Sequence, residues 1–440
     1  MEKFNNIEKI GNKEIQGETT WKSPSNIALV KYWGKYGRQM PANASVSFTL
    51  ENAYSKTTMK YKNGSGKVTL FFEGEKNEDF GEKIEKFMES VKDINPFYQE
   101  LDYEISSTNS FPHSAGIASS ASAMSALCMG LCKIEKTLFG TLKDKDTFLQ
   151  KASYLSRLAS GSASRSVYPK LGQWGEHAGI EGSSNLYAID VHDRVDPIFH
   201  TYKNSILIAS SAVKEVSSTL GHKMMNENPY AAVRFAQAND NLQKLMDAMK
   251  IGDLDTFMQI VELEALTLHA LMMTSNPSFI LLQPSTIVMI DRIRKFRKAS
   301  GLPVCFTLDA GPNIHLLYPE KIATEVQKCH LGDSNIMVNN NVSINCNGLN
   351  SNSIINYIAA SSNSPFDNLK NIYNINSNQQ YMTKGIRQHS SWVANLNWQD
   401  SDLGFIWLAA KSNDKIHIRT CFKLSCSSSS NRIESFVALN

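Results

Sequence analysis

The chain has 440 residues, of which 42% are apolar and 20% charged, a balance typical of a globular protein with room for two or three domains. Because 45 basic residues nearly balance 42 acidic ones, the composition excludes a general attraction to nucleic acid or to an anionic membrane surface. No apolar run reaches the about 20 residues that span a bilayer, and residues 1–15 lack the apolar core of a signal peptide. We therefore expect a cytoplasmic protein without nucleic-acid or membrane partners.

The seven cysteines are scattered along the chain, and in the cytoplasm they are expected to stay reduced. Cys128 and Cys132 lie four residues apart in a segment predicted to be a buried helix, where small core residues are commoner than a disulfide or a metal pair. The sequence contains no H-E-x-x-H, C-x-x-C or G-x-S-x-G motif. It therefore offers no support for a zinc hydrolase or a serine hydrolase.

From Thr19 to about Asp196, short β-rich runs are mixed with helical patterns. We expect strands at 67–72, 101–107 and 185–191, and helices at 80–94, 121–131 and 147–160. This order of elements predicts an α+β domain over residues 1–200.

The second half opens with an apolar strand at 205–210 and continues with three helical patterns. We expect the helices within 229–250, 254–273 and 286–300, followed by a strand at 304–311 and an apolar run at 314–319. This order predicts a second α+β domain over residues 201–330.

The last 110 residues, 331–440, have a different composition, because about one third of them are Asn or Ser. A segment of this kind without a lasting amphipathic period buries too little apolar surface to offset its chain entropy. Apolar pieces such as 403–412 nevertheless interrupt it. We expect an irregular tail, and two hypotheses explain it: a lineage-specific extension, or the translation of a shifted reading frame.

The first motif that suggests chemistry is SPSNIALVKYWGK, from Ser23 to Lys35. Lys31 and Lys35 are four residues apart, so a helical or tight conformation would let them gather several phosphate oxygens. On spacing alone, a solvated surface pair is the alternative. Tyr32 and Trp33, two large side chains between the charges, favour a partly enclosed site.

The second motif is FPHSAGIASSASAMSALCMGLC, from Phe111 to Cys132. Pro112 and Gly116 indicate a turn, and the serines that follow can cap a helix. Free backbone N–H groups at a helix start, together with hydroxyl groups and the helix dipole, form a seat for an anion such as phosphate. The alternative is a capped core helix without a ligand.

Two further motifs place single charged groups beside glycine turns. In LASGSASRSVY, Arg165 follows Gly161 and Ser162, and its guanidinium suits bidentate binding of a carboxylate or phosphate. In FTLDAGPN, Asp309 ends an apolar strand, where a carboxylate can act as a base or stabilise charge. The alternatives are an Arg on a helix surface and an Asp that caps a turn.

These motifs, in this order, resemble a known family. The pattern P-x-x-x-G-I-A-S-S-A at 112–121 is similar to the phosphate-binding loop of the GHMP kinase superfamily. That loop differs from a Walker loop because it lacks the pattern G-x-x-x-x-G-K. SPSNIALVKYWGK, SGSASRS and LDAGPN more closely resemble the diphosphomevalonate decarboxylase family, over about residues 19–330. The resemblance implies an α+β, two-domain GHMP kinase fold with a ribosomal protein S5 domain 2-like N-terminal half and a ferredoxin-like C-terminal half, followed here by the irregular tail.

The resemblance also implies a reaction. Enzymes of this family use ATP and Mg²⁺ to phosphorylate the tertiary 3-hydroxyl of (R)-5-diphosphomevalonate, after which phosphate and CO₂ leave and isopentenyl diphosphate remains. It follows that ATP would be the co-substrate, Mg²⁺ the cofactor and a small molecule the substrate. Both reactants are polyanions, which agrees with basic side chains gathered locally in a nearly neutral chain.

The roles of individual residues follow from the same resemblance. Asp309 would face the 3-hydroxyl, with Lys31 and Arg165 as the other catalytic residues. Arg165 with Asn26 would hold the substrate carboxylate, and Lys31 with Tyr32 its diphosphate. The full set implied for substrate binding is Asn26, Tyr32, Lys35, Ser162, Arg165, Ser217 and Ser218, the last two from KEVSST.

The Gly/Ser loop would take the ATP phosphates. The residues implied for ATP binding are Pro112, Gly116, Ile117, Ala118, Ser119 and Ser120, of which the two serines would also lie near Mg²⁺.

The sequence departs from the family at two places. Ser164 stands where many relatives carry Cys, and the Asn/Ser-rich tail replaces a short Gly-containing end. Three alternatives remain open: a GHMP-fold kinase or decarboxylase that acts on mevalonate or a mevalonate monophosphate, a non-catalytic GHMP-fold binding protein, and an inactive product of a damaged gene. By family habit, we expect a homodimer.

Overall fold

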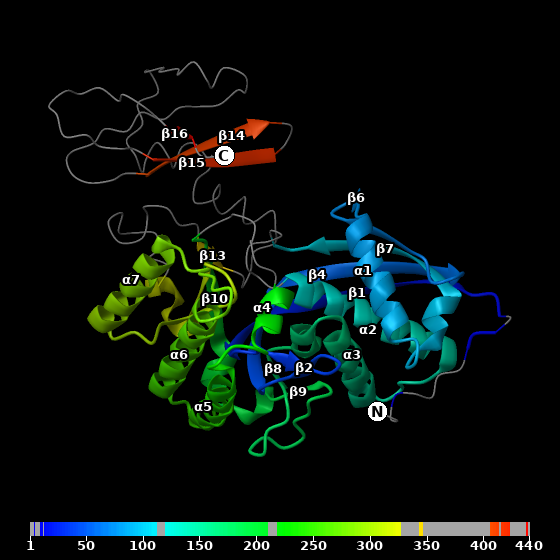
Figure 1. Ribbon diagram of the computed structural model, residues 1–440, viewed down its shortest axis with the longest axis horizontal. Helices are drawn as coiled ribbons and strands as arrows, with labels where there is room; N and C mark the ends of the chain where they lie inside the picture. The colour runs from blue at the N-terminus through cyan, green and yellow to red at the C-terminus, as the bar shows by residue number, and fades with distance from the viewer. Residues whose placement is uncertain are drawn as a thin grey trace. The chain divides into compact units, whose positions relative to one another are not determined.

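The computed structural model describes residues 4, 9–11, 13–111, 119–209 and 218–326, and the backbone of strands at 343–345, 405–412, 415–422 and 437–438. At residues 218 and 219 it also describes the backbone alone. The described elements from β1 to β13 belong to one compact unit, and β14 to β16 belong to a second. Each unit is described here by itself (Figure 1).

A mixed sheet forms the first layer of the larger unit. Its two long strands, β1 and β4, pair antiparallel, with Asn26 opposite Thr49. In this sheet β5 and β7 are parallel, and the other pairs are antiparallel. The strand order is β6 (Glu75–Lys76), β5 (Val68–Phe72), β7 (Leu101–Asn109), β4 (Ser45–Asn63), β8 (Leu171–Trp174) and β9 (Ala188–Asp190), with β1 (Gln16–Val30) also on β4.

Three helices accompany this sheet: α1 (Glu78–Ser90), α2 (Ser119–Phe139) and α3 (Lys145–Ala159). The side chains of Asn77 and Asp144 cap α1 and α3 by accepting the N–H groups of Phe80 and Thr147, as expected for helix starts. Helix α2 packs against β1 and β4, which explains why nearly all of its side chains are apolar or small.

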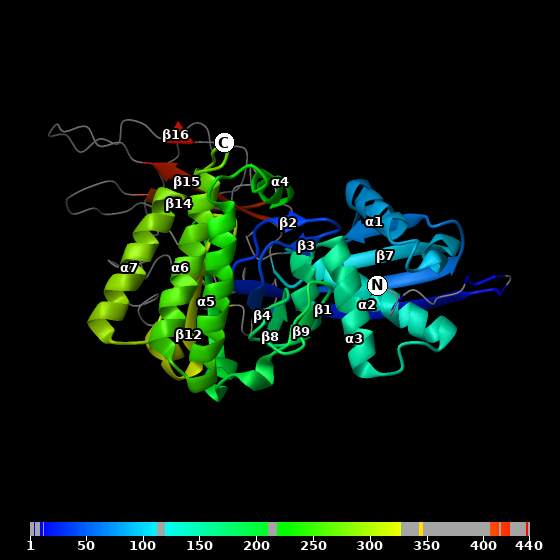
Figure 2. The ribbon, with the colours of Figure 1, turned by 60° about the horizontal axis from the view of Figure 1, so that its bottom comes forward.

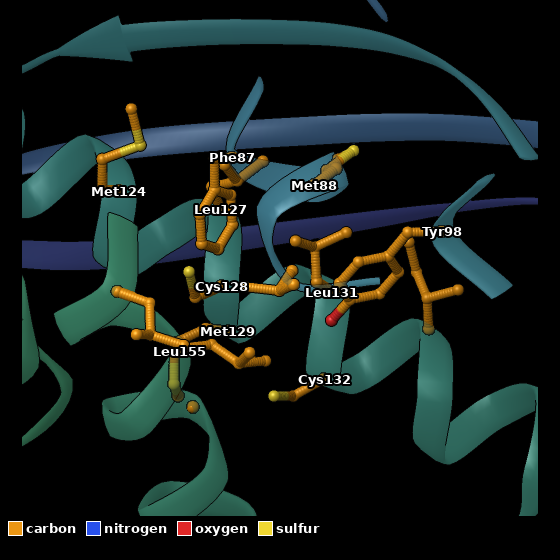
Figure 3. Packing of buried hydrophobic residues seen from close by; sticks show 14 of the residues in the cluster. Phe87, Met88, Tyr98, Met124, Leu127, Cys128, Met129, Leu131, Cys132 and Leu155 are labelled. Carbon is orange, nitrogen blue, oxygen red and sulfur yellow. The ribbon is translucent and has the colours of Figure 1, made fainter. Parts of the chain in front are cut away.

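The core of this half lies between α2, α1 and α3, where Leu127 and Leu131 join Phe87 and Leu155 in one buried cluster (Figure 3). Cys128 and Cys132 belong to the same cluster, and both are fully buried free thiols. The prediction that they are small core residues is therefore confirmed.

A second sheet, with the order β11 (Cys305–Leu308), β12 (Ile314–Pro319), β10 (Tyr202–Leu207) and β13 (Ser343–Asn345), is antiparallel throughout its described pairs. Helices α5 (Ala231–Ile251), α6 (Leu254–Met273) and α7 (Pro284–Ser300) lie side by side in both ribbon views (Figures 1 and 2). Gly252, with φ +74°, ends α5, and Asp253 caps α6 directly afterwards, so the chain reverses within two residues.

Short elements connect these layers. They are β2 (Lys35–Tyr36), β3 (Met40–Pro41), α4 (Ser218–Met224) and the 3-10 helices η2 (Pro96–Glu100), η3 (Gly161–Val167), η4 (His192–Arg194), η5 (Pro197–Thr201) and η6 (Glu320–Ile322). In the second unit, β14 (Phe405–Ser412), β15 (Lys415–Phe422) and β16 (Val437–Ala438) pair antiparallel.

The helices and strands predicted between 67 and 319 are present, and the α+β class is confirmed. The division into 1–200 and 201–330 stays a prediction, because residues 1–324 fall in one unit without a boundary near residue 200. Most of the tail 331–440 lies outside the described residues, although the apolar piece 403–412 contains β14. Among the described helices, none is long and apolar enough to cross a membrane.

Candidate active site

A buried lysine and a more accessible aspartate form the centre of the site. Lys31 follows the last residue of β1, and Asp309 follows the last residue of β11. The Lys31 Nζ atom lies 3.2 Å from Asp309 Oδ1, and it also donates a hydrogen bond to the carbonyl oxygen of Ala28 at 2.6 Å. The two side chains are 2% and 29% exposed, so the ammonium group is held inside while the carboxylate reaches the surface of the site.

Helix α6 holds both members of this pair through their backbones. The N–H group of Lys31 donates to Glu264 Oε2 at 2.9 Å, and the carbonyl oxygen of Asp309 lies 3.1 Å from His269 Nε2. Glu264 also accepts from Arg234 Nη2 and, at 2.6 Å, from Asn241 Nδ2 on α5. One helix therefore sets the separation of two residues that are distant in sequence.

The electrostatics of Lys31 reflect this burial. Loss of solvent lowers the pKa of Lys31, while the neighbouring carboxylates of Asp309 and Glu264 act in the opposite direction. The positive charge of Arg165 adds a further, smaller lowering effect on the pKa of Lys31. An additional anion would stabilise both cations.

Arg165 lies in η3, and its side chain is buried. It donates to Ser45 Oγ and, at 3.4 Å, to Asn26 Oδ1, but its Nε atom has no hydrogen-bond partner among the residues that the structure describes. No carboxylate oxygen of the described residues lies within 4.0 Å of this guanidinium. Burial lowers its pKa to about 10. A buried cation with spare donors and without a carboxylate partner is suited to an anionic ligand.

Asn26 links β1 to η3. Its Nδ2 atom donates to the carbonyl oxygen of Ser162 at 3.1 Å and to Ser166 Oγ at 2.7 Å, while its Oδ1 atom faces Arg165. Gly172 on β8 permits this packing, because a Cβ atom there would lie 2.9 Å from the carbonyl oxygen of Arg165. The structure thus brings Asn26, Ser162 and Arg165 together.

The ring of Tyr32 packs between Trp174 and His222, with centroid distances of 4.7 and 4.4 Å. Its hydroxyl faces η3, since a Cβ atom on Gly161 would lie 2.7 Å from it. Burial raises the pKa of Tyr32, so the hydroxyl stays protonated and can donate to an anion. Tyr32 and Ser162 therefore border the same part of the site.

Lys35 is placed differently from Lys31. The chain between them is not helical, Lys35 opens β2, and its Nζ atom donates to Gln39 Oε1 at 2.6 Å. Partial burial lowers the pKa of Lys35. The helical arrangement that would gather the two ammonium groups is absent from this described segment, and a shared phosphate contact of both lysines stays a prediction.

Part of the predicted ATP loop lies outside the described residues, namely Pro112, Gly116, Ile117 and Ala118. Ser119 and Ser120 are the first two residues of α2, with Ser119 half-buried and Ser120 exposed. Ser217 also lies outside the described residues, and Ser218 begins α4 without a described side chain.

Sequence reasoning missed several residues that support the site. Glu264 and His269 are buried polar side chains within the apolar pattern of 254–273, and such an exception could have signalled them. The ring of His222 packs at a tilt against Tyr32 and Trp33 and accepts the N–H group of Gly34 at 2.9 Å. Nothing in its local sequence indicated this position.

No group of three or more His, Cys, Asp or Glu side chains within the described ranges could hold a metal ion by itself. A magnesium ion that binds together with phosphates needs only one or two protein oxygens. The carboxylate of Asp309 and the hydroxyls of Ser119 and Ser120 are donors of that kind.

Two family models match the chain. The diphosphomevalonate decarboxylase-like N-terminal domain matches residues 23–186, and the mevalonate 5-diphosphate decarboxylase C-terminal domain matches residues 205–388. The gap between them lies near residue 200, and the second match continues past residue 330 into the Asn/Ser-rich segment.

Curated relatives agree with these models. Diphosphomevalonate decarboxylase of Schizosaccharomyces pombe is 26% identical over 327 residues, which cover 69% of this chain and 79% of the relative. Phosphomevalonate decarboxylase of Haloferax volcanii is 26% identical over 306 residues, which cover 68% and 88% of the two chains.

Solved structures show the same fold. Mevalonate diphosphate decarboxylase from Staphylococcus aureus has a TM-score of 0.64 and 28% identity, and the match covers 75% of this chain and 96% of that one. MDDEF in complex with MVAPP, AMPPCP and magnesium has a TM-score of 0.64 and 25% identity, with 75% and 97% covered. The order of motifs, the fold and both domain models lead to one conclusion: this chain belongs to the diphosphomevalonate decarboxylase family.

Proposed function

We propose that Lys31, Arg165 and Asp309 carry out the ATP-dependent decarboxylation of (R)-5-diphosphomevalonate to isopentenyl diphosphate, CO₂, ADP and phosphate. The observation that carries the assignment is the buried guanidinium of Arg165, which has no carboxylate within 4.0 Å in the described part of the chain. It contacts Asn26 on β1, the strand whose Ala28 carbonyl oxygen accepts from Lys31 Nζ. The substrate carboxylate would supply the missing counter-charge. Asn26 orients Arg165 for this contact. The side chains that line the substrate-binding site are Tyr32, Lys35 and Ser162.

In the first half of the reaction, Asp309 orients the tertiary 3-hydroxyl toward the γ-phosphoryl group of ATP. A tertiary alcohol is too weak an acid to lose its proton fully to a carboxylate whose ordinary pKa is about 4. In a loose phosphoryl-transfer transition state, however, the oxygen needs little prior deprotonation. Asp309 therefore accepts the proton late, as the new O–P bond forms and the bond to ADP breaks.

In the second half, the C3–O bond breaks and its electron pair leaves with phosphate. Asp309 passes the proton to an oxygen of the transferred phosphoryl group and, as a carboxylate again, stabilises the positive charge that develops at C3, while Lys31 offsets negative charge on the departing group. The C–C bond to the carboxylate then supplies the electrons of the new double bond as CO₂ leaves. Arg165 holds the carboxylate until that bond breaks.

We further propose that ATP and Mg²⁺ bind at the start of α2, through Pro112, Gly116, Ile117, Ala118, Ser119 and Ser120. A helix of 21 residues that begins with two serines presents unpaired N–H groups and hydroxyls, which fit phosphate oxygens. When bound, Mg²⁺ would neutralise charge on the phosphates. MDDEF, a structural relative, has been solved with AMPPCP and magnesium, which supports this assignment.

Several finer statements remain predictions: substrate contacts of Ser217 and Ser218, the cytoplasmic location, the homodimer and the division at residue 200. The resemblance to the family supports the contacts of Ser217 and Ser218 and the homodimer, and the sequence pattern supports the cytoplasmic location and the division.

The test uses the full chain with ATP and three substrates: 5-diphosphomevalonate, mevalonate 5-phosphate and mevalonate. ADP and CO₂ are measured together. The proposal expects equal amounts of both products with 5-diphosphomevalonate. ADP without CO₂ would identify a kinase, and neither product with any substrate would favour a binding protein or an inactive chain.

A second candidate function is decarboxylation of the monophosphate, because the match to phosphomevalonate decarboxylase covers 88% of that relative. Both reactions share the carboxylate and the 3-hydroxyl, so the roles of Arg165 and Asp309 are the same. A larger kcat/KM with mevalonate 5-phosphate than with 5-diphosphomevalonate would establish this alternative.

A further inference from the structure

The peptide group that joins Lys31 to Tyr32 lies just past the paired part of β1. In the described pairing of β1 with β4, the last pair is Val30 with Val46, so Lys31 lies beyond the end of the ladder. Lys31 is 2% exposed, and buried backbone N–H and C=O groups are almost always hydrogen-bonded. Side chains from other segments supply those hydrogen bonds here.

Two buried side chains bind the backbone of Lys31, one at each polar group. Glu264 Oε2 accepts the N–H group of Lys31 at 2.9 Å, and Asn43 Nδ2 donates to its carbonyl oxygen at 3.0 Å. Asn43 is 4% exposed and Glu264 is fully buried, so bulk water does not replace either contact. The carbonyl group of Lys31 and the N–H group of Tyr32 belong to one planar peptide group. Asn43 therefore fixes the orientation of the peptide between these two residues.

The amide of Asn43 donates two hydrogen bonds in this position. Besides the carbonyl oxygen of Lys31, its Nδ2 atom donates to the carbonyl oxygen of Ala44 at 2.8 Å. Two carbonyl acceptors require an NH₂ group, because an oxygen in its place would face only the lone pairs of other oxygens. Aspartate has the same shape as asparagine but offers no donor when it is ionised. The contact therefore depends on the amide and not only on the size of the side chain.

Neighbouring elements hold the segment that carries Asn43. The N–H group of Ala44 donates to Asn239 Oδ1 on α5 at 3.0 Å. Gly175, which directly follows β8, packs on the same residue, because a Cβ atom at Gly175 would lie 2.5 Å from the Cα atom of Ala44. Asn43 therefore reaches Lys31 from a position that α5 and the end of β8 fix.

The side chains on the two sides of this peptide both belong to the candidate active site. Lys31 Nζ lies 3.2 Å from Asp309 Oδ1, and the ring of Tyr32 packs between Trp174 and His222. A change in the orientation of the peptide plane alters ψ of Lys31 and φ of Tyr32, and with them the directions of both side chains. A misplacement of about 1 Å at a reacting group can lower a rate by about 10²-fold. A contact that fixes this peptide therefore acts on both residues at once.

We propose that Asn43 is a positioning residue for the decarboxylation: through the carbonyl oxygen of Lys31, it directs the Lys31 ammonium group to Asp309 and the Tyr32 hydroxyl to the substrate. The inference rests on the proposed function, because it concerns the roles of Lys31 and Tyr32 in that reaction. It requires no contact between Asn43 and the substrate. Loss of the amide should lower kcat and weaken substrate binding, whereas ATP, whose phosphates would bind at the start of α2, should bind as before.

The test is steady-state kinetics of the full chain with ATP and 5-diphosphomevalonate, in which ADP and CO₂ are measured. Asn43→Asp keeps the shape of the side chain and removes its donors, and Asn43→Ala removes the amide without burying a charge. In both variants we expect kcat to fall by about 10-fold to 10²-fold, and the dissociation constant for 5-diphosphomevalonate to rise. With saturating 5-diphosphomevalonate, the KM for ATP should change little. If Asn43→Asp does not fold, Asn43→Ala decides the test.

Asn228→Ala is the matched control, because Asn228 is 7% exposed and its Nδ2 atom donates to the carbonyl oxygen of Leu271 at 3.0 Å. It also removes a buried amide, so it should lower the free energy of unfolding in urea, as Asn43→Ala does, and leave kcat unchanged. An active wild type with near-normal kcat in Asn43→Ala, or an equal loss of kcat in Asn228→Ala, would overturn this inference alone. A wild type that releases no CO₂ would overturn the proposed function as well.

Discussion

Lys31 and Asp309 lie 278 positions apart in the chain, yet Lys31 Nζ and Asp309 Oδ1 are 3.2 Å apart. The asymmetry of this pair has a chemical consequence: the lysine is 2% exposed and the aspartate 29%. A substrate hydroxyl can therefore approach the carboxylate from the open side while the ammonium group fixes it from within. The following predictions test this arrangement and the residues that maintain it.

Replacement of Asp309 should separate turnover from binding. In Asp309→Asn and Asp309→Ala, we expect kcat to fall by about 10²-fold to 10⁴-fold, the range for a lost proton acceptor. The dissociation constant for 5-diphosphomevalonate should change little, because its anionic groups contact other residues. Steady-state kinetics and equilibrium titration measure the two effects. Asp93→Asn, at the exposed Arg38–Asp93 pair, is the control, and near-normal turnover of the Asp309 variants would disprove the assignment.

Arg165→Ala should weaken substrate binding as well as rate. The loss of a charge-assisted hydrogen bond costs about 1.5 to 3 kcal/mol, which corresponds to a dissociation constant raised about 10-fold to 150-fold. Arg165→Lys keeps the charge but loses the planar guanidinium, so its dissociation constant should lie between those of the wild type and Arg165→Ala. Arg157→Lys changes a buried arginine that donates to the carbonyl oxygens of Leu186 and Arg38, so it should alter stability without altering substrate affinity. An unchanged affinity in Arg165→Ala would refute the carboxylate contact.

Glu264→Gln should destabilise the fold and slow the reaction. Glu264 is fully buried and is the ion-pair partner of Arg234, which is 7% exposed, so the variant leaves a buried cation without its counter-charge. We expect the free energy of unfolding to fall by about 3 kcal/mol, and kcat to fall because the N–H group of Lys31 loses a charged acceptor. Urea denaturation measures the first effect.

The matched control for Glu264 is Glu104→Gln, at the exposed Lys60–Glu104 pair. This pair is expected to contribute less than about 1 kcal/mol. Similar stability losses in the two variants would show that burial of the Glu264–Arg234 pair has no special effect.

His222 should make the stability of the protein depend on pH. Burial, with a smaller effect from Lys35, lowers its pKa to about 3, whereas the unfolded chain has an ordinary histidine pKa of about 6.5. Between these values the unfolded state binds more protons, so the free energy of unfolding falls as the pH drops below about 6.5. At pH 5 the loss relative to pH 8 is about 2 kcal/mol.

Urea denaturation at pH 8, 6 and 5 measures this dependence in the wild type and in His222→Gln. Gln can still accept the N–H group of Gly34 but cannot titrate. The variant should therefore lack the part of the pH dependence of the unfolding free energy that His222 causes. The same slope in both proteins would mean that other groups cause it.

The sequence predicted local structure well where the pattern that indicates a helix lies within one short segment. The helical patterns at 80–94, 147–160 and 254–273 correspond to α1, α3 and α6, because hydrophobic periodicity is a property of adjacent residues. The approach of Arg165 to Asn26 agrees with the roles implied by the motifs, although the carboxylate contact itself stays a proposal. Lys35 shows the limit: its spacing from Lys31 suggested a shared contact, but the strand that follows β1 gave the two side chains different partners.

What the sequence by itself determined is the set of elements, the order of the motifs and the identity of the charged groups. The tertiary structure decided which of these groups meet. Glu264 and His269 hold Lys31 and Asp309 because α6 packs on β11 and also contacts β1, and such contacts depend on packing between distant segments. Local residue patterns carry no record of long-range neighbours, so burial, ion pairing and pKa are established when the layers come together.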